Sequence, residues 1–348
     1  MTIIIKGDDI MKKEKIAKSV IKTTLSTALR AIEKDPKRST RDLVEKGLAF
    51  SNSRFQAGFF NMISSMLINN DSEYYTLTEN ISKEVNNEYI YKFGMNIGYN
   101  SCVIGAKKIR KIKIEDDIDV PWLIAINYSS KEKFGVKRLK SLLDESRSLG
   151  IYFYPIIIES NDVNDLIAIF EKYDDCSFAL LIKDNCIDET YIENIEKYKN
   201  VGTVLNKNVE NFTEICEKIK NKKILYATYL TYDENTIFDD KIFDEVKNET
   251  NTFFMMIPTK ETSVNKISEA GEFAKKCRFK QNLPFIVVDA ISDAEFYNDI
   301  LTGNSRMLAF DANGTIYVKS KNTIKKDINI SSNKLINILK YSSDVDNF

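Results

Sequence analysis

The sequence predicts an α/β protein with a partial or full TIM-type (β/α) barrel, a helical region before it and a small β-hairpin and helix after it. Three observations support this fold class. Short runs rich in β-branched and aromatic residues recur between residues 121 and 290. Amphipathic stretches separate these runs at intervals of roughly 20–30 residues, which is typical of βαβ units and a parallel sheet. The residues before 117 show helical patterns, whereas those after 290 contain a hairpin signal.

Residues 1–116 are predicted to form the helical region. Residues 19–36 place apolar side chains on one face at helical spacing, and Pro36 is expected to end that helix. Ser39 and Asp42 match a capping box, which predicts that the next helix begins at Ser39. The charge run that closes the region, basic and then acidic, is interpreted as a solvated linker or a helix end.

Residues 117–290 are predicted to form the barrel. Between the strands, segments such as 136–150 and 163–174 have the apolar spacing of amphipathic helices. Several successive strand–helix units are the signature of a full or partial barrel. The candidate strands are residues 121–127, 150–158, 176–182, 201–206, 223–230, 252–258 and 284–290.

Residues 291–348 are predicted to form a separate C-terminal segment. Residues 305–320 alternate like two strands around Asn313 and Gly314, a pair that favours a type I′ hairpin turn. Residues 333–343 have the spacing of a short terminal helix.

The composition excludes several kinds of chemistry. The chain of 348 residues contains no histidine, so histidine-dependent catalysis and most zinc sites are excluded. Its 12 glycines include no phosphate-binding glycine motif. The five cysteines form no C-x-x-C pair and are expected to be buried, reduced thiols. A net charge of -1 gives no overall attraction to nucleic acid or to an anionic membrane.

We expect a soluble, cytoplasmic protein. No apolar run approaches the ~18 residues of a membrane span. The first residues, MTIIIKGDDIMKKEK, have three isoleucines followed by charges, which is too short for the apolar part of a signal peptide.

The order of several segments resembles the radical SAM proteins that carry a C-terminal auxiliary-cluster (SPASM-like) segment. The matching pieces are AIEKDPKR, VPWLIAIN, SLGIYFYPIII, EKYDDCSFALLIKDNCIDE and LTGNSRMLAFDANGTIYVKS. The resemblance covers roughly residues 25–320 and implies a radical SAM barrel at 117–290, followed by a degenerate auxiliary segment. The helical N-terminal extension and the Pro-Trp pair in the first strand resemble one bacterial branch of these proteins in particular.

The motifs that carry the chemistry of that family are missing. The family holds an iron–sulfur cluster through C-x-x-x-C-x-x-C after the first strand, but here Ser129, Ser130 and Lys131 follow that strand. No cysteine lies between Cys102 and Cys176. Thiolates are the usual ligands of such clusters, so the resemblance predicts a barrel without its cluster.

Three further positions depart from the family pattern. The Gly-Gly-Glu-Pro turn, which approaches SAM, corresponds to Ile158, Glu159, Ser160 and Asn161. The Thr-Asn-Gly-Thr turn after the third strand corresponds to Ile182, Lys183, Asp184 and Asn185. The auxiliary-cluster cysteines would fall near Ile300 and Lys319. Because the motifs are lost at several separate sites, the pattern favours a protein that kept the fold of the family and lost its redox chemistry.

We therefore predict a non-catalytic homologue that acts as an accessory, regulatory or binding protein, without cofactor or metal. Its expected partner is an intact radical SAM paralogue, a peptide or a second copy of the chain, and neither nucleic acid nor a membrane. One alternative is a sensor that still binds SAM, a nucleotide or a peptide. A second is a repurposed barrel enzyme that uses Asp, Glu and Lys chemistry. For both, the possible pocket comprises polar residues at strand ends: Asn127, Tyr128, Glu159, Lys183, Asp184, Asn206, Thr231, Asp233, Lys260 and Asp289.

Overall fold

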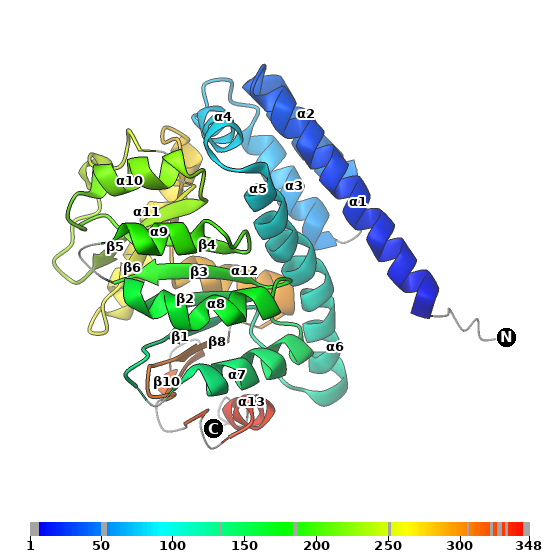
Figure 1. The fold of residues 1–348 in the computed structure, drawn as a ribbon, viewed down its shortest axis with the longest axis vertical. Coiled ribbons are helices and arrows are strands. Elements are labelled where there is room, and N and C mark those ends of the chain that lie inside the picture. Colours follow the sequence, from blue (N-terminus) through cyan, green and yellow to red (C-terminus); the bar gives the residue numbers. More distant parts are fainter. Residues whose placement is uncertain are drawn as a thin grey trace. The chain divides into compact units, whose positions relative to one another are not determined.

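The computed structural model describes residues 7–49, 54–132, 134–183, 187–249, 252–304, 306–320, 323–325, 329–330 and 333–343. The contacts divide the chain into two compact units, Met1–Lys83 and Glu84–Phe348. Figure 1 shows the helices of the first unit in blue and cyan and the sheet of the second in green to orange. The boundary after residue 116, which separates the predicted helical region from the predicted barrel, stays a prediction.

The first unit is helical. Its core contains Val44, Leu67 and Tyr75, with Phe60, Ile63 and Tyr74 packed against them. The helices are α1 (Gly7–Ile32), α2 (Pro36–Ala49), α3 (Arg54–Met66) and α4 (Tyr74–Glu84).

The predicted start of the second helix is wrong. Helix α2 begins at Pro36, and Ser39 lies buried inside it. Proline suits the first helical position because its φ is already helical and its missing N–H needs no partner there. The Asp35 carboxylate accepts from Arg38 N at 3.1 Å, so Asp35 supplies the side-chain contact predicted for Ser39.

A continuous helical stretch precedes the sheet of the second unit. It consists of α5 (Asn87–Gly94), a π-helical segment η1 (Met95–Gly105) and α6 (Ala106–Asp116). The Asn96 amide donates to Cys176 O at 2.7 Å, and the Tyr89 hydroxyl donates to Ile195 O at 2.8 Å. These bonds reach the chain just before the strands that begin at Ser177 and Val201, so the stretch lies at the amino ends of the sheet. The final charge run, expected as a linker or helix end, is mostly helix α6.

The sheet has the order β10-β9-β8-β1-β2-β3-β4-β5-β6-β7. Neighbours from β1 to β7 pair in parallel, and β8 pairs in parallel with β1. Because β7 lies at one edge of this order, the sheet is a partial barrel, which confirms the predicted fold class. Its seven central strands are β1 (Ile124–Asn127), β2 (Phe153–Ile158), β3 (Ser177–Ile182), β4 (Val201–Asn206), β5 (Tyr226–Tyr232), β6 (Phe253–Pro258) and β7 (Ile286–Asp289).

Helices follow most of the strands. They are α7 (Val136–Leu149), α8 (Val163–Lys172), α9 (Glu189–Ile195), α10 (Phe212–Asn221), α11 (Val264–Lys280) and α12 (Ser292–Thr302). Short 3-10 turns, η2 (Ser160–Asp162) and η3 (Asp240–Phe243), follow β2 and β5. Gly150 caps the end of helix α7 with a φ of 105°, and a β-carbon at this position would lie 2.8 Å from Gly105 O, so both features favour glycine.

The predicted C-terminal hairpin is formed by β8 (Met307–Phe310) and β9 (Ile316–Ser320), but its turn differs from the prediction. A type I′ turn needs a positive φ at both central residues, and Gly314 has one while Asn313 does not. Instead, the Asp311 carboxylate accepts from Asn313 N at 3.0 Å and Thr315 N at 2.8 Å. Strand β10 (Thr323–Lys325) and helix α13 (Leu335–Ser343) complete the described segment.

The two faces of the sheet have different surroundings. Tyr154 on β2 bonds to Ser146 of α7, and Phe178 on β3 packs against Phe170 of α8 with ring centroids 5.2 Å apart. These side chains therefore point toward the helices, and their strand neighbours point the other way. We call this second side the open face. It carries the buried Ala179, Leu181, Val204, Ala227 and Tyr229, flanked by the partly exposed Phe153, Ile157, Met255 and Ile257.

Candidate functional site

The carboxyl ends of β1, β2 and β3 lie side by side. Asn127 is in register with Ile157, and Ile158 is in register with Ile182. This is the edge at which parallel α/β sheets bind ligands. The positions that the resemblance assigns to the first cluster and to SAM, after β1 and after β2, are therefore neighbours.

The loop after β1 is held to α8 by polar contacts. The Ser130 hydroxyl donates to Asp162 Oδ1 at 2.6 Å. Tyr128 Oη donates to Asp165 Oδ2 at 3.1 Å. Burial, together with the nearby Asp165 and Asp162 carboxylates, raises the pKa of Tyr128, so this phenol stays protonated and acts as a donor.

An aromatic contact fixes the far end of the same loop. Phe134 has no exposed surface and stacks on Phe310 of β8, with ring centroids 6.2 Å apart. Its backbone N–H donates to Ala312 O at 3.1 Å. The loop is thus packed against the β8–β9 hairpin and α8. Phe134, Asp162 and Asp165 were missed by sequence reasoning because none belongs to a local motif.

The end of β2 has no glycine turn. Ile158 has no exposed surface, as expected for a core side chain. Glu159 is partly exposed and its carboxylate lies 3.7 Å from Lys131 Nζ, while Ser160 begins the buried turn η2 and Asn161 is exposed. These four residues stand where the resemblance places a glycine turn, and none of them is a glycine.

The end of β3 has one buried and one exposed residue. Ile182 is fully buried, and its carbonyl accepts from the hydroxyl of Tyr229 on the open face at 2.9 Å. Lys183 is exposed and its Nζ lies 3.5 Å from Asn127 Oδ1. The predicted positions Asp184 and Asn185 lie outside the described residues.

The described members of the possible pocket make separate local contacts. Asn127 contacts Lys183, whereas Tyr128, the next residue, points to α8. Glu159 pairs with Lys131. Of the others, Asn206 and Asp233 accept from backbone N–H groups two residues ahead, Thr231 and Lys260 are exposed, and Asp289 is fully buried.

Asp289 belongs to a closed polar network at the end of β7. Its two carboxylate oxygens accept from Ser292 N at 2.7 Å and from Tyr232 Oη at 2.8 Å. Both oxygens of the neighbouring Asp293 accept from Arg278 at 2.8 Å. Burial raises the pKa of Asp289, and the bonds from Ser292 and Tyr232 oppose that shift. Each oxygen has a partner and Asp289 has no exposed surface, so the network suits a structural role.

Among the described residues, those at the β1 edge include no thiol that could hold an iron–sulfur cluster. The described cysteines lie elsewhere: Cys102 on η1, Cys176 before β3, Cys216 on α10 and Cys277 on α11. Burial raises the pKa of each, to about 12 for Cys102 and about 11 for Cys277, which disfavours the thiolate that iron requires. Cys186 lies outside the described residues. Among the described residues, no group of three or more Cys, Asp or Glu side chains could hold a metal ion.

The fold is a parallel (β/α) partial barrel in which the carboxyl ends of β1, β2 and β3 lie side by side. No protein-family model and no curated protein matches the chain. Among solved structures, it is similar to Streptococcus suis SuiB bound to S-adenosylmethionine, at 12% identity and a TM-score of 0.48, over 67% of this chain and 66% of SuiB. The match thus spans just under two thirds of SuiB's length. SuiB bound to precursor peptide SuiA gives the same identity and TM-score.

A second likeness is to 3-dehydroquinate dehydratase from Geobacillus kaustophilus HTA426, at 7% identity and a TM-score of 0.39, over 66% of this chain and 93% of that chain. At these identities the likenesses concern the fold alone. In the described part of the chain, no helix is long and apolar enough to cross a membrane.

Proposed function

We propose that this protein is a non-catalytic homologue of the radical SAM proteins that acts by binding, as an accessory or regulatory protein. It holds no iron–sulfur cluster and does not cleave SAM. The observation that carries the proposal is the loop after β1. The order of sequence segments resembles the family, yet this loop has Ser129, Ser130 and Lys131 in place of thiolates.

The packing of that loop supports the same conclusion. A cluster-binding loop has to present its ligands to the space above the strands. Here the Ser130 hydroxyl is bonded to Asp162, and Phe134 is buried against Phe310. These contacts give the loop a structural role of its own, and they would be lost if it opened toward a metal cluster.

The open face supports a binding role. Its side chains are mainly apolar, and Phe153, Ile157, Met255 and Ile257 at its margins are only partly buried. Concave, mostly apolar surfaces with few polar groups are typical of ligand and peptide sites. We propose that a peptide or protein partner, including an intact paralogue or a second copy, occupies this face.

Anaerobic reconstitution with iron and sulfide tests the central part of the proposal. Purified full-length protein should bind no stoichiometric iron after desalting and show no protein-dependent absorption near ~400 nm. A matched variant with all five cysteines changed to serine should give the same trace. Iron that binds in fixed ratio to the natural chain and is lost in the serine variant would overturn the proposal.

A further inference from the structure

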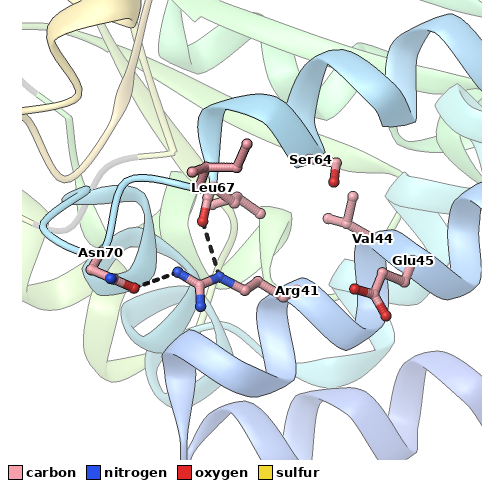
Figure 2. Close-up of a pocket in the computed structure, with 7 residues that line it drawn as sticks. Arg41, Val44, Glu45, Ser64, Leu67 and Asn70 are labelled. Atoms are coloured by element: carbon pink, nitrogen blue, oxygen red, sulfur yellow. Dashed lines mark hydrogen bonds between the residues drawn. The ribbon is translucent and has the colours of Figure 1, made fainter.

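The first unit contains a pocket of about 340 Å³, shown in Figure 2. This volume lies at the lower end of the ~300–1,000 Å³ found for small-molecule sites. Helix α2, the end of α3 and the chain that follows α3 form it. The lining residues are Arg41, Val44, Glu45, Ser64, Leu67, Ile68 and Asn70.

The guanidinium of Arg41 is held in one orientation. Its Nε donates to Leu67 O at 2.9 Å and to Tyr75 Oη at 2.8 Å, and its Nη2 donates to Asn70 Oδ1 at 2.7 Å. The Tyr75 ring lies 5.3 Å from Cζ. Within the described chain, Nη1 donates to nothing. A fixed guanidinium with spare N–H groups is well suited to bind a carboxylate.

A carboxylate of the chain lines the same pocket. Glu45 lies four residues after Arg41 on α2, and its side chain has no hydrogen bond or ion pair with any described residue. Figure 2 shows the Arg41 guanidinium beside Leu67 and Asn70, whereas the Glu45 carboxylate lies near Val44. The pocket therefore has one positive group, Arg41, and one negative group, Glu45, that are available to a ligand. A ligand with a single charge would pair with only one of them.

Val44, Leu67 and Ile68 supply the apolar part of the lining. Val44 and Leu67 are buried, while Ile68 is 77% exposed. A large apolar side chain left in water beside a pocket gains free energy when an apolar ligand covers it. The partly buried Ser64 adds a hydroxyl that has no partner in the described chain.

We propose that this pocket binds a free α-amino acid with an apolar side chain. The ligand's carboxylate bonds to Arg41, its ammonium pairs with Glu45, and its side chain packs on Val44 and Ile68. The carboxylate and the ammonium of the zwitterion are the opposite charges to those of Arg41 and Glu45. This site is in the first unit and does not depend on the function proposed for the barrel.

Titration of the full-length protein with L-leucine by calorimetry tests the proposal. Leucine should bind saturably. Leucinamide lacks the carboxylate and N-acetylleucine lacks the ammonium, so each should bind at least tenfold more weakly. Equal binding of leucine and leucinamide, or no saturable binding of leucine up to its solubility limit, would overturn the proposal.

Glu45→Gln provides the sharper comparison, because Glu45 is exposed and its substitution should leave the fold intact. The variant should bind leucine at least tenfold more weakly than the natural chain, with unchanged binding of N-acetylleucine. Glu33→Gln removes an equally exposed carboxylate outside the pocket and should bind leucine normally. If both variants bind leucine like the natural chain, Glu45 does not hold the ammonium and the proposed ligand is wrong.

Discussion

Ile157 and Ile158 are neighbours on β2 that point to opposite faces of the sheet, so they test the assignment of the open face. Ile158 has no exposed surface and lies on the helix side, whereas Ile157 is partly exposed on the open face. Changing each to alanine removes the same atoms from the same strand. Strand propensity, backbone position and chemistry are matched, and only the surroundings differ.

The expected magnitudes follow from burial. Isoleucine to alanine removes three carbons, worth about 2.5 kcal/mol of transfer free energy when the side chain is fully buried. The cavity left in a packed interior adds to this, so Ile158→Ala should lower the unfolding free energy by about 3–4 kcal/mol. Ile157→Ala should cost about 1.5–2 kcal/mol, because part of the side chain is already in contact with water and its removal leaves no closed cavity.

Urea denaturation followed by circular dichroism measures both variants. The difference of about 2 kcal/mol corresponds to a melting temperature about 4–8 °C lower for Ile158→Ala than for Ile157→Ala. Equal losses in the two variants would show that both faces are packed alike. The open face would then be an ordinary core, and the binding role proposed for it would fail.

Two further predictions concern pH and backbone conformation. Burial alone would raise the pKa of Glu145, but bonds from Arg138 and other donors outweigh it and lower the pKa below its usual 4.5. Glu145→Gln should therefore lower the unfolding free energy at pH 7. In urea titrations, the difference in unfolding free energy between the natural chain and the variant should shrink below pH 4.5, because protonation of Glu145 removes its contribution from the natural chain. A difference that does not change with pH would contradict this. Gly150→Ala should cost more stability than Gly303→Ala in thermal melts, since both have positive φ but only the first crowds Gly105 O. Equal losses would mean that the close approach is unimportant.

The strands could be predicted because their sequences carry a strong local signal. Each central strand lies within a few residues of its predicted range, since β-branched and aromatic runs bounded by polar turns have few other structures open to them. The parallel order β1 to β7 follows from short connections that place successive strands side by side.

Contacts between distant segments could not be predicted in the same way. The pairing of β8 with β1 leaves no mark on the hairpin sequence, because the alternation of residues 307–310 is the same for a free hairpin and for a strand within the sheet. The type I′ turn was predicted from Asn313 and Gly314 alone. The structure has a different turn, in which the Asp311 carboxylate accepts hydrogen bonds from two backbone N–H groups of the loop.

The predicted pocket shows the same limit. Asn127 and Tyr128 both follow from the end of β1, but successive side chains on a strand point to opposite faces. One therefore reaches Lys183 and the other Asp165. Position at a strand end identified the right edge of the sheet, while the direction of each side chain decided which residues meet.

The measurement that tests the central claim most directly is the consumption of SAM by the protein after anaerobic treatment with iron, sulfide and a strong reductant. The account predicts that the natural chain and the variant with all five cysteines changed to serine cleave SAM at the same background rate. Cleavage that increases with the concentration of the natural chain, and is absent from the serine variant, would contradict it.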